Sequence, residues 1–411
     1  MNFDEIKQTE AQAIMPTYGR FDIAITSGHG STAVDTNGKE YIDFGSGIGV
    51  NCLGYCDEGW VNAISAQAAK LQHTSNLYYT QPQTELAKKL CDVSRFSKVF
   101  LANSGAEANE CAIKLARKYS FDKYGDGRNK ILSIRNSFHG RTITTLAATG
   151  QDSFHNFFMP FTSGFDYLDI PTLCAKNARN FDIKKTCEKI GDDVCAVMIE
   201  LIQGEGGVDC FAPNLIHALR DFCKQKDILF IVDEVQTGVG RTGTMFAYQS
   251  YHIRPDIVTL AKGLGGGLPI GACMCNDKLS GVLSAGMHAS TFGGNPVACA
   301  GANYILDVVS NKNFLEEVRH KGHTMLERFE PLSSENSAKF EARGMGMMFG
   351  IKLPDDMNPR DVAVKCAENG LLVLTAKGNV VRLLPPLNIS YDDLEKGLDI
   401  LEKVLEKESN Q

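Results

Sequence analysis

Lys262 is the one cation in an otherwise apolar and glycine-rich stretch, TLAKGLGGGLPIGA (residues 259–272). A lysine ammonium is strongly hydrated, so it is seldom placed among apolar residues and tightly packed backbone without a partner. One interpretation is a strand-to-loop junction whose lysine extends to water. The other is an amine that loses its proton and forms a Schiff base with a carbonyl compound. The rest of a site is needed to choose between them.

Two other stretches could bind a phosphate. NSGAEAN (residues 103–109) follows the apolar run KVFLA and opens a predicted helix, where Ser104 and Gly105 allow close approach to free backbone N–H groups. An ordinary helix cap explains this stretch equally well. STFGGNP (residues 290–296) adds the hydroxyls of Ser290 and Thr291 and exposed backbone for a second phosphate contact.

Asp233 directly follows a run of apolar residues in ILFIVDEVQTG, so we expect its carboxylate at the rim of a buried sheet. A carboxylate there needs a cation or hydrogen-bond donors. A protonated pyridine nitrogen is such a cation, because its ring can then accept electrons. Gln236, three residues on, could reach another substituent of the same ring.

Gly238, Gly240 and Gly243 match the GxGxxG pattern of dinucleotide-binding proteins. That fingerprint requires the glycines at a turn between a strand and a helix. Here the first glycine comes five residues after the strand, and no clear helix follows. An NAD-dependent oxidoreductase is therefore retained only as a weaker alternative.

The remaining candidates are an aromatic ring and several charged residues. In SFHGRT, Phe138 could stack on a flat ring and Arg141 could bind a carboxylate. ELIQGEGG places Glu200 and Glu205 after another predicted strand, and VVRLLPP places Arg382 at the end of a later one. Taken singly, each arginine is more typical of a structural ion pair. Taken together, the amine, acid, phosphate loops, aromatic ring and arginines predict a pyridoxal 5′-phosphate site for an acidic substrate.

Composition excludes several other classes of protein. The 411 residues are 43% hydrophobic and 22% charged, as in ordinary globular proteins, and length alone suggests about two to three domains. The net charge of −7 and the absence of a Lys/Arg-rich block argue against nucleic acid as a partner. No apolar run approaches the ~18 residues of a membrane span, and the polar, acidic first residues are unlike a signal peptide. We therefore expect a cytoplasmic protein.

The 13 cysteines are scattered and include no CxxC pair, which favours reduced core thiols. His320 and His323 lack a third ligand, so no metal is predicted. Short β-branched runs alternate with helical patterns from residue 98 to 275, which predicts a mostly parallel sheet covered on both faces. After Pro296, two long helices, short strands and a terminal helix from Asp392 predict a smaller α+β domain. In such sheets ligands bind beyond the carboxyl ends of the strands.

The motifs NSGAEANE, SFHGRT, IQGEGG, DEVQTGVGRTG, LAKGLGGGLPIGA, STFGGNP and RLLPPLNIS resemble those of class III pyridoxal-phosphate aminotransferases. MPTYGRF near the start and HTSNLYYTQPQTELAKKL (residues 73–90) are similar to the acetylornithine subgroup of that class. The resemblance covers nearly the whole chain. It implies an α/β, fold-type I architecture and a homodimer with shared active sites. We expect an N-terminal segment at 1–80, contributing to the small domain and the interface, a large cofactor-binding domain at 81–296, and a small domain at 297–411 that opens with a linking helix.

The resemblance also implies roles for individual residues. Lys262 would carry the cofactor, Asp233 would pair with its pyridine nitrogen, and Thr291 would come from the neighbouring subunit. The implied cofactor-binding residues are Ser104, Gly105, Ala106, Phe138, Glu200, Asp233, Gln236, Lys262 and Thr291. The implied substrate-binding residues are Tyr18, Arg141, Glu205, Ser290 and Arg382. Among them, Glu205 would pair with Arg382 until 2-oxoglutarate displaces it, and Arg141 would bind the distal carboxylate of either substrate. Leu201 stands where the family usually has a proline after the glutamate that corresponds to Glu200, and this difference removes no catalytic group.

The implied reaction moves the terminal amino group of N2-acetyl-L-ornithine to 2-oxoglutarate, as in arginine biosynthesis. Succinylornithine, succinyl-diaminopimelate, ornithine and 4-aminobutyrate remain alternative donors, because small changes in a pocket wall shift selectivity only ~10–200-fold. A scaffold that kept the fold and lost the reaction is a third class of alternative.

Overall fold

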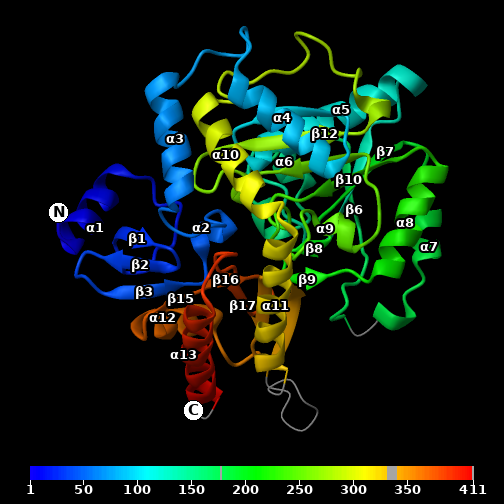
Figure 1. Ribbon diagram of the computed structural model, residues 1–411. Helices are drawn as coiled ribbons and strands as arrows, with labels where there is room; N and C mark the ends of the chain where they lie inside the picture. Colours follow the sequence, from blue (N-terminus) through cyan, green and yellow to red (C-terminus); the bar gives the residue numbers. More distant parts are fainter. Residues whose placement is uncertain (176–177, 331–339, 410–411) are drawn as a thin grey trace.

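A computed structural model describes residues 1–175, 178–330 and 340–409. Its largest sheet has seven strands in the order β4-β12-β11-β10-β7-β5-β6 (Figure 1). In that order their bounds are Lys98–Ala102, Gly271–Cys275, Ile257–Leu260, Leu229–Asp233, Val194–Ile199, Lys130–Ile134 and Phe165–Leu168. Only β12 runs antiparallel to its neighbours in this sheet. The connection 261–270 is shorter than the dozen or so residues that a parallel crossover needs. The predicted mainly parallel α/β sheet is confirmed.

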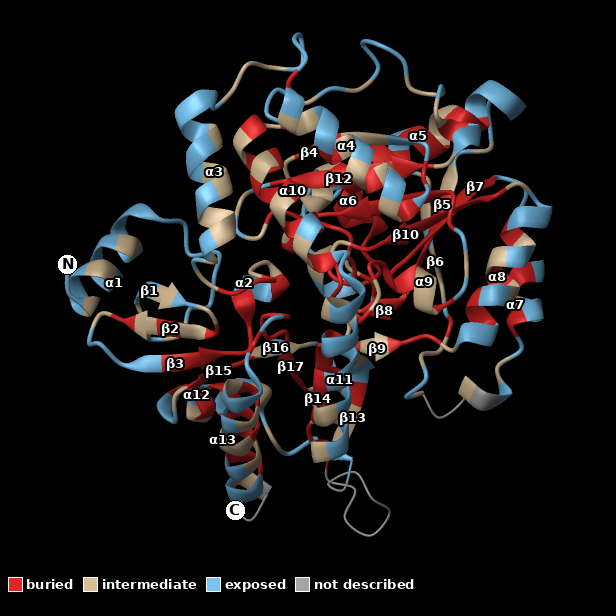
Figure 2. Cartoon of the chain, viewed as in Figure 1, coloured by how far each residue is buried: buried red, intermediate tan, exposed pale blue. Residues whose placement is uncertain are grey.

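The central strands are buried on both faces, as continuous apolar runs require (Figure 2). In β10, Phe230 and Val232 belong to the core cluster that includes helix α8 (Pro213–Gln225). Leu229 and Ile231 point the other way, into the cluster that includes helix α5 (Gly105–Tyr124). This alternation follows from the two-residue period of a strand.

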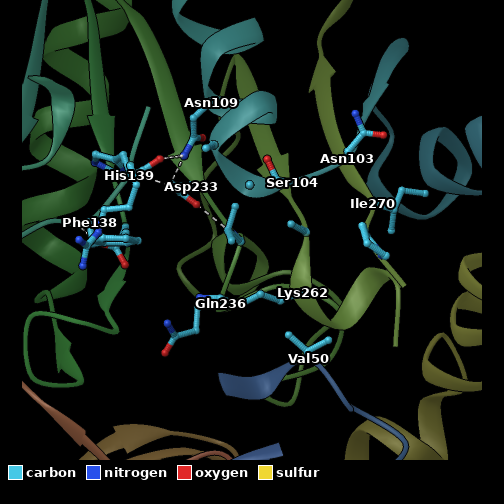
Figure 3. A pocket seen from close by; sticks show the side chains of 18 of the residues that line it. Val50, Asn103, Ser104, Asn109, Phe138, His139, Asp233, Gln236, Lys262 and Ile270 are labelled. Carbon is cyan, nitrogen blue, oxygen red and sulfur yellow. Dashed lines mark hydrogen bonds and ion pairs between the residues drawn. The ribbon is translucent and has the colours of Figure 1, made fainter. Parts of the chain in front are cut away.

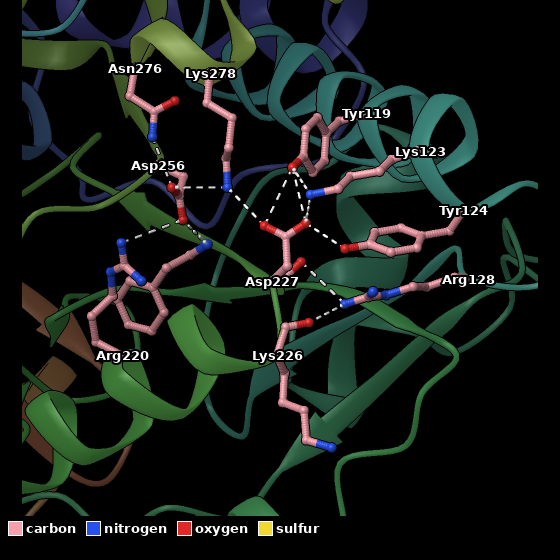
Figure 4. A network of polar contacts seen from close by, with 11 residues as sticks. Tyr119, Lys123, Tyr124, Arg128, Arg220, Lys226, Asp227, Asp256, Asn276 and Lys278 are labelled. Atoms are coloured by element: carbon pink, nitrogen blue, oxygen red, sulfur yellow. Dashed lines mark hydrogen bonds and ion pairs between the residues drawn. The ribbon is translucent and has the colours of Figure 1, made fainter.

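A network centred on Asp227 ties the far end of α5 to the start of β10 (Figure 4). The Asp227 carboxylate accepts hydrogen bonds from Tyr119, Lys123 and Tyr124 at 3.0, 2.8 and 2.6 Å, and it pairs with Lys278 at 3.2 Å. Partial burial alone raises the pKa of Asp227, but these bonds outweigh it and hold the pKa well below its usual range. The network therefore anchors the two elements whose opposite ends form the pocket described below.

The smaller, C-terminal part contains a four-stranded antiparallel sheet in the order β13-β14-β17-β16. Its strands are Glu341–Met345, Met348–Lys352, Val380–Leu383 and Leu374–Ala376. Helices α11 (Lys312–Phe329), α12 (Pro359–Glu368) and α13 (Tyr391–Ser409) pack against it or against one another. The predicted terminal helix is present, and Ser390 Oγ accepts a hydrogen bond from Asp393 N at 3.0 Å.

The first strands of the chain join this C-terminal part. Strands β1 (Ile25–His29), β2 (Thr32–Asp35) and β3 (Glu40–Asp43) form a sheet whose fourth strand is β15 (Leu371–Leu372), parallel to β3. Between them and the large sheet, helix α10 (Pro296–Val309) packs against α3 (Glu58–Lys70) and α4 (Gln81–Ser94). Both ends of the chain therefore lie on one side of the large sheet (Figure 1).

Shorter elements complete the described chain: α1 (Phe3–Ala13), α2 (Ser46–Gly49), η1 (Asp152–Phe154), α6 (Ile143–Ala148), η2 (Ala178–Asn180), α7 (Ile183–Glu188), β8 (Ile202–Gln203), β9 (Asp209–Cys210), α9 (Ala247–Ser250), η3 (Lys262–Leu264) and η4 (Asp277–Leu279). Within the described ranges, no helix has the length and apolar character that crossing a bilayer requires. The same residues hold no cluster of three or more His, Cys, Asp or Glu suited to a metal ion.

Candidate active site

A pocket of about 440 Å³ lies beyond the carboxyl ends of β4, β7, β10 and β11 (Figure 3). Parallel strands bring their ends to one edge of a sheet, so residues far apart in sequence meet there. The predicted residues that line it are Ser104, Gly105, Ala106, Phe138, Arg141, Glu200, Asp233, Gln236 and Lys262.

Lys262 follows β11 and begins η3 with φ = 44°, in the left-handed region. A non-glycine residue there costs about 1–3 kcal/mol, which the surrounding structure must offset. Hydrogen bonds from Leu264 N to Ala261 O (2.9 Å) and from Gly265 N to Lys262 O (3.0 Å) hold the turn. No partner for Lys262 Nζ is found in the part of the chain that the structure describes. Its burial lowers the pKa of the amine, which favours the neutral, nucleophilic form.

The glycines after Lys262 are explained by the tightness of this loop. A Cβ at Gly265 would lie 1.9 Å from the carbonyl oxygen of Leu268, and Gly266 and Gly267 have φ of 58° and 131°. Only glycine adopts this path without strain. The run therefore returns the chain to β12 and is not a phosphate loop.

Asp233 is held by three donors. Its Oδ1 accepts from Val235 N at 2.9 Å, while Oδ2 lies 2.7 Å from Asn109 Nδ2 and 2.8 Å from His139 Nδ1. Asn109 Nδ2 also donates to the carbonyl of His139 at 2.8 Å. An ionised carboxylate has about four acceptor sites, so one remains for a ligand in the pocket.

The two side chains on Asp233 were not predicted from the sequence. Asn109 and His139 are almost fully buried, in contrast to the usual exposure of Asn and the intermediate burial of His. Asn109 lies within the largely apolar run of α5, and His139 follows the predicted ring-stacking residue Phe138. A polar residue inside a buried helix was the available signal, but its partner is 124 residues away.

The start of α5 has the features of an anion site. Ser104 Oγ accepts from Glu107 N at 3.2 Å, and the first intrahelical bond runs from Ala108 N to Ser104 O. The N–H groups of Gly105 and Ala106 precede that bond and line the pocket. A Cβ at Gly105 would lie 2.8 Å from Val235, so glycine keeps this approach open.

Glu200 supports the pocket through the backbone. It accepts from Phe138 N at 2.8 Å and from Gly204 N at 3.3 Å, and its burial raises its pKa. Leu201, the departure from proline, is fully buried, and its carbonyl accepts from Tyr251 Oη at 3.1 Å.

Arg382 and Glu205 form an ion pair beside the pocket. Arg382 Nη1 lies 2.7 Å from Glu205 Oε1 and 3.2 Å from the side-chain oxygen of Gln236, which lines the pocket. Arg382 is 2% exposed. Burial alone raises the pKa of Glu205, but the guanidinium outweighs it and lowers the pKa. The pair lies close enough to Lys262 to influence its charge.

Besides Glu205 and Arg382, three further predicted residues do not line the pocket of a single chain. Tyr18 is 71% exposed and lies against Arg20. Thr291 is exposed. Ser290 lies at the rim, where its hydroxyl accepts from the side chain of Asn103 at 2.9 Å. Their predicted roles remain predictions, and that of Thr291 requires a second subunit.

The GxGxxG segment does not form a dinucleotide turn. The first helix after it, α9, begins only at Ala247, and a Cβ at Gly240 would lie 2.5 Å from Val309. Arg241, inside the pattern, is buried and donates to the carbonyls of Met347 (3.1 Å) and Pro385 (2.6 Å). Gly238 packs against Leu260, and Gly240 and Gly243 pack against Val309 and Arg319, so these glycines serve packing and the oxidoreductase alternative is wrong.

Residues 14–405 match the family described as aminotransferase class-III. The chain belongs to this family. It is 50% identical to an acetylornithine aminotransferase of Haemophilus ducreyi, over 98% of this chain and 99% of that protein. The structure resembles the ornithine aminotransferase of Toxoplasma gondii (TM-score 0.92, 30% identity, 100% and 97% of the two chains). It also resembles N-acetylornithine aminotransferase from Stenotrophomonas maltophilia (TM-score 0.81, 34% identity, 97% and 98%).

Class III aminotransferases use pyridoxal 5′-phosphate, and the pocket fits that cofactor. Lys262 offers an amine without a partner among the described residues. Asp233 keeps one free acceptor site for a pyridine nitrogen, and the N-terminal amides of α5 suit a phosphate. The predicted fold-type I architecture is confirmed by the same comparisons.

Glu234, next to Asp233, is a buried carboxyl that was not predicted. It accepts from Thr237 Oγ1 (2.6 Å), Ala247 N (3.0 Å) and Tyr248 N (2.8 Å), and so fixes the loop after β10. Burial raises its pKa from 4.5 to about 7. The folded state then keeps a proton that the unfolded state loses, so stability falls as pH rises from about 4.5 to about 7.

We expect Glu234→Gln to remove this pH dependence. Its single amide oxygen can accept from only one of Ala247 N and Tyr248 N, so the variant should also be less stable at every pH. Relative to the variant, the wild type should lose about 3 kcal/mol of unfolding free energy between the two ends of that range, as an upper bound. Melting temperatures of both holoenzymes from pH 4.5 to 8 measure the difference. If the difference in melting temperature between the wild type and the variant did not change with pH, Glu234 would have the same pKa in the folded and the unfolded state.

Proposed function

We propose that the enzyme transfers the terminal amino group of N2-acetyl-L-ornithine to 2-oxoglutarate, giving N-acetyl-L-glutamate 5-semialdehyde and L-glutamate. One observation carries the proposal: Arg382 is neutralised by Glu205 at 2.7 Å, whereas Arg141 has no carboxylate partner among the described residues. The site thus holds one arginine, Arg141, that is free to bind a carboxylate, and a second, Arg382, that is already paired with one. The names of the relatives, which are 40–50% identical, support the choice of donor.

The charges of the two substrates explain why this arrangement is suitable. The donor carries its single carboxylate far from the reacting amine, whereas 2-oxoglutarate has carboxylates at both ends. An arginine left bare beside the donor would be an unpaired buried charge, at a cost of ~3–5 kcal/mol. We infer that Arg141 binds the distal carboxylate of either substrate. Glu205 masks Arg382 until the second carboxylate of 2-oxoglutarate displaces it.

The chain's own residues would act as follows. Lys262 would hold the cofactor and, once the substrate amine has taken its place, its free amine would accept the proton of the amine-bearing carbon. Asp233, fixed by Asn109 and His139, holds a proton at the pyridine nitrogen. When bound, the cofactor supplies an aldehyde carbon for amines and a ring that accepts electrons. The α5 amides and Thr291 would bind its phosphate, Phe138 would stack on its ring, and Gln236 would lie near the ring hydroxyl.

A donor panel tests the substrate. We expect kcat/KM with 2-oxoglutarate to be highest for N2-acetyl-L-ornithine, with succinylornithine and succinyl-diaminopimelate next. Free ornithine and 4-aminobutyrate should react more slowly. A higher kcat/KM for either of these last two would overturn the choice of donor.

We also propose a homodimer with shared active sites in the cytoplasm. Thr291 is exposed, and its predicted phosphate contact needs a neighbouring subunit. Large apolar side chains are exposed nearby, including Leu77 (85%) and Phe292 (61%). Light scattering should give twice the 44.9 kDa of one chain. A cofactor-loaded and active species at 44.9 kDa would contradict the proposal.

A further inference from the structure

The guanidinium of Arg141 lies against two aromatic rings that also contact each other. Its guanidinium carbon is 4.2 Å from the centre of the Phe154 ring and 5.6 Å from that of Phe138. The two rings meet edge to face, with centres 5.8 Å apart and planes at 73°. Phe138 and Arg141 line the pocket, whereas Phe154 lies behind Arg141 and does not line it.

Phe154 is held firmly to the segment that carries Arg141. Phe154 N donates to Gln151 O at 3.1 Å, and the side chain of Gln151 donates to Ser137 O at 3.3 Å. On its other side, His155 Nε2 lies 2.8 Å from the carbonyl of Thr149. These bonds fix the backbone of the segment relative to the pocket wall, and the contact of the Phe154 ring with Phe138 orients the ring.

Stacking leaves the hydrogen-bonding edge of a guanidinium free. Its N–H donors lie in the plane and match a carboxylate, while its face packs on aromatic rings. A long arginine side chain otherwise loses about 2 kcal/mol of rotamer entropy when it is fixed. A ring that holds it beforehand reduces this loss on binding.

We propose that Phe154 is a positioning residue that pre-orients Arg141 for the distal carboxylate of the substrates. The proposal rests on the proposed function, because it takes Arg141 as the carboxylate-binding residue. It adds that the neighbouring η1 segment, and not the pocket wall alone, sets how tightly an acidic substrate binds.

The test uses glutarate, a dicarboxylate that lacks the reacting carbonyl, bound to the holoenzyme and measured by calorimetry. We expect Phe154→Leu to weaken glutarate binding about two- to fivefold, the range of an exposed cation–π contact. Phe154→Tyr keeps the ring and should bind as the wild type does. In turnover, Phe154→Leu should raise KM for both substrates and leave kcat near the wild-type value.

A double-mutant cycle separates positioning from a general structural effect. In the Arg141→Met background, we expect Phe154→Leu to cause no further loss of glutarate affinity. Phe165→Leu is the matched control, because Phe165 is a half-buried ring 4.9 Å from the guanidinium of Arg117, outside the pocket. It should leave glutarate affinity unchanged.

The possible failures are distinct. If Arg141→Met abolishes glutarate binding while Phe154→Leu has no effect, the inference is overturned and the proposed function stands. The inference is likewise overturned if Phe154→Leu costs the same with and without Arg141. If Arg141→Met binds glutarate as the wild type does, the role of Arg141 in the proposed function fails as well.

Discussion

Lys262→Ala should bind the cofactor without turning over substrate. The phosphate and ring contacts that we propose for the cofactor do not involve Lys262, so the cofactor should remain bound non-covalently. Removing a general base alone typically lowers the rate ~10²–10⁴-fold, and here the covalent attachment is lost too. Single-turnover measurements with N2-acetyl-L-ornithine give the rate. Bound cofactor is measured by its absorbance after gel filtration.

Borohydride treatment provides the control for this prediction. In the wild type it should fix the cofactor on the peptide that contains residue 262, as mass spectrometry detects, and in Lys262→Ala it should fix none. Lys278→Ala, which alters a lysine in the Asp227 network, should retain both turnover and attachment. Turnover of Lys262→Ala within threefold of the wild type would overturn the mechanism.

Arg382→Ala should impair the half-reaction with 2-oxoglutarate much more than the half-reaction with the donor. The loss removes the cation for the second carboxylate and leaves Glu205 without its partner at 2.7 Å. Breaking a buried ion pair costs about 3–5 kcal/mol, so the effect should be a hundredfold or more in order of magnitude. Arg141→Ala should impair both half-reactions. Stopped-flow absorbance, with each substrate in turn, measures them separately.

Glu205→Gln is the complementary variant. It unmasks Arg382, so the donor half-reaction should slow while the 2-oxoglutarate half-reaction is largely retained. This opposite pattern is not expected from a general loss of structure. Equal losses in both halves for Arg382→Ala would make Arg382 a structural cation.

Local patterns predicted the parts of the site that follow buried strands. Asp233 is the last residue of β10, and Lys262 and Ser104 each come two residues after a strand that is recognisable from its apolar run. Because strand ends converge at one edge, their meeting in one pocket could be inferred without coordinates. The sequence also disfavoured a dinucleotide turn, because the glycines at 238, 240 and 243 lie too far from the strand, and the structure then excluded it.

The partners of these residues depended on contacts between distant segments. His139 meets Asp233 across 94 residues, and Glu205 meets Arg382 across 177. Each of these side chains alone is compatible with a surface position or an ordinary ion pair. Nothing in the sequence around Glu234 indicated that its side chain turns inward and accepts hydrogen bonds from the amides of Ala247 and Tyr248.

By itself, then, the sequence determined the class of sheet, the family motifs and the residues at the strand ends, because strand periodicity and turn chemistry are local. The resemblance implied the pairing of Glu205 with Arg382, but only the tertiary structure showed it and decided the contacts of the other charged groups. It leaves Lys262 and Arg141 without charged partners among the described residues, neutralises Arg382 with Glu205, and places Phe154 under Arg141. The physical reason is that the free energy of a charge depends on its burial and on the atoms around it, and those atoms come from segments that only folding brings together.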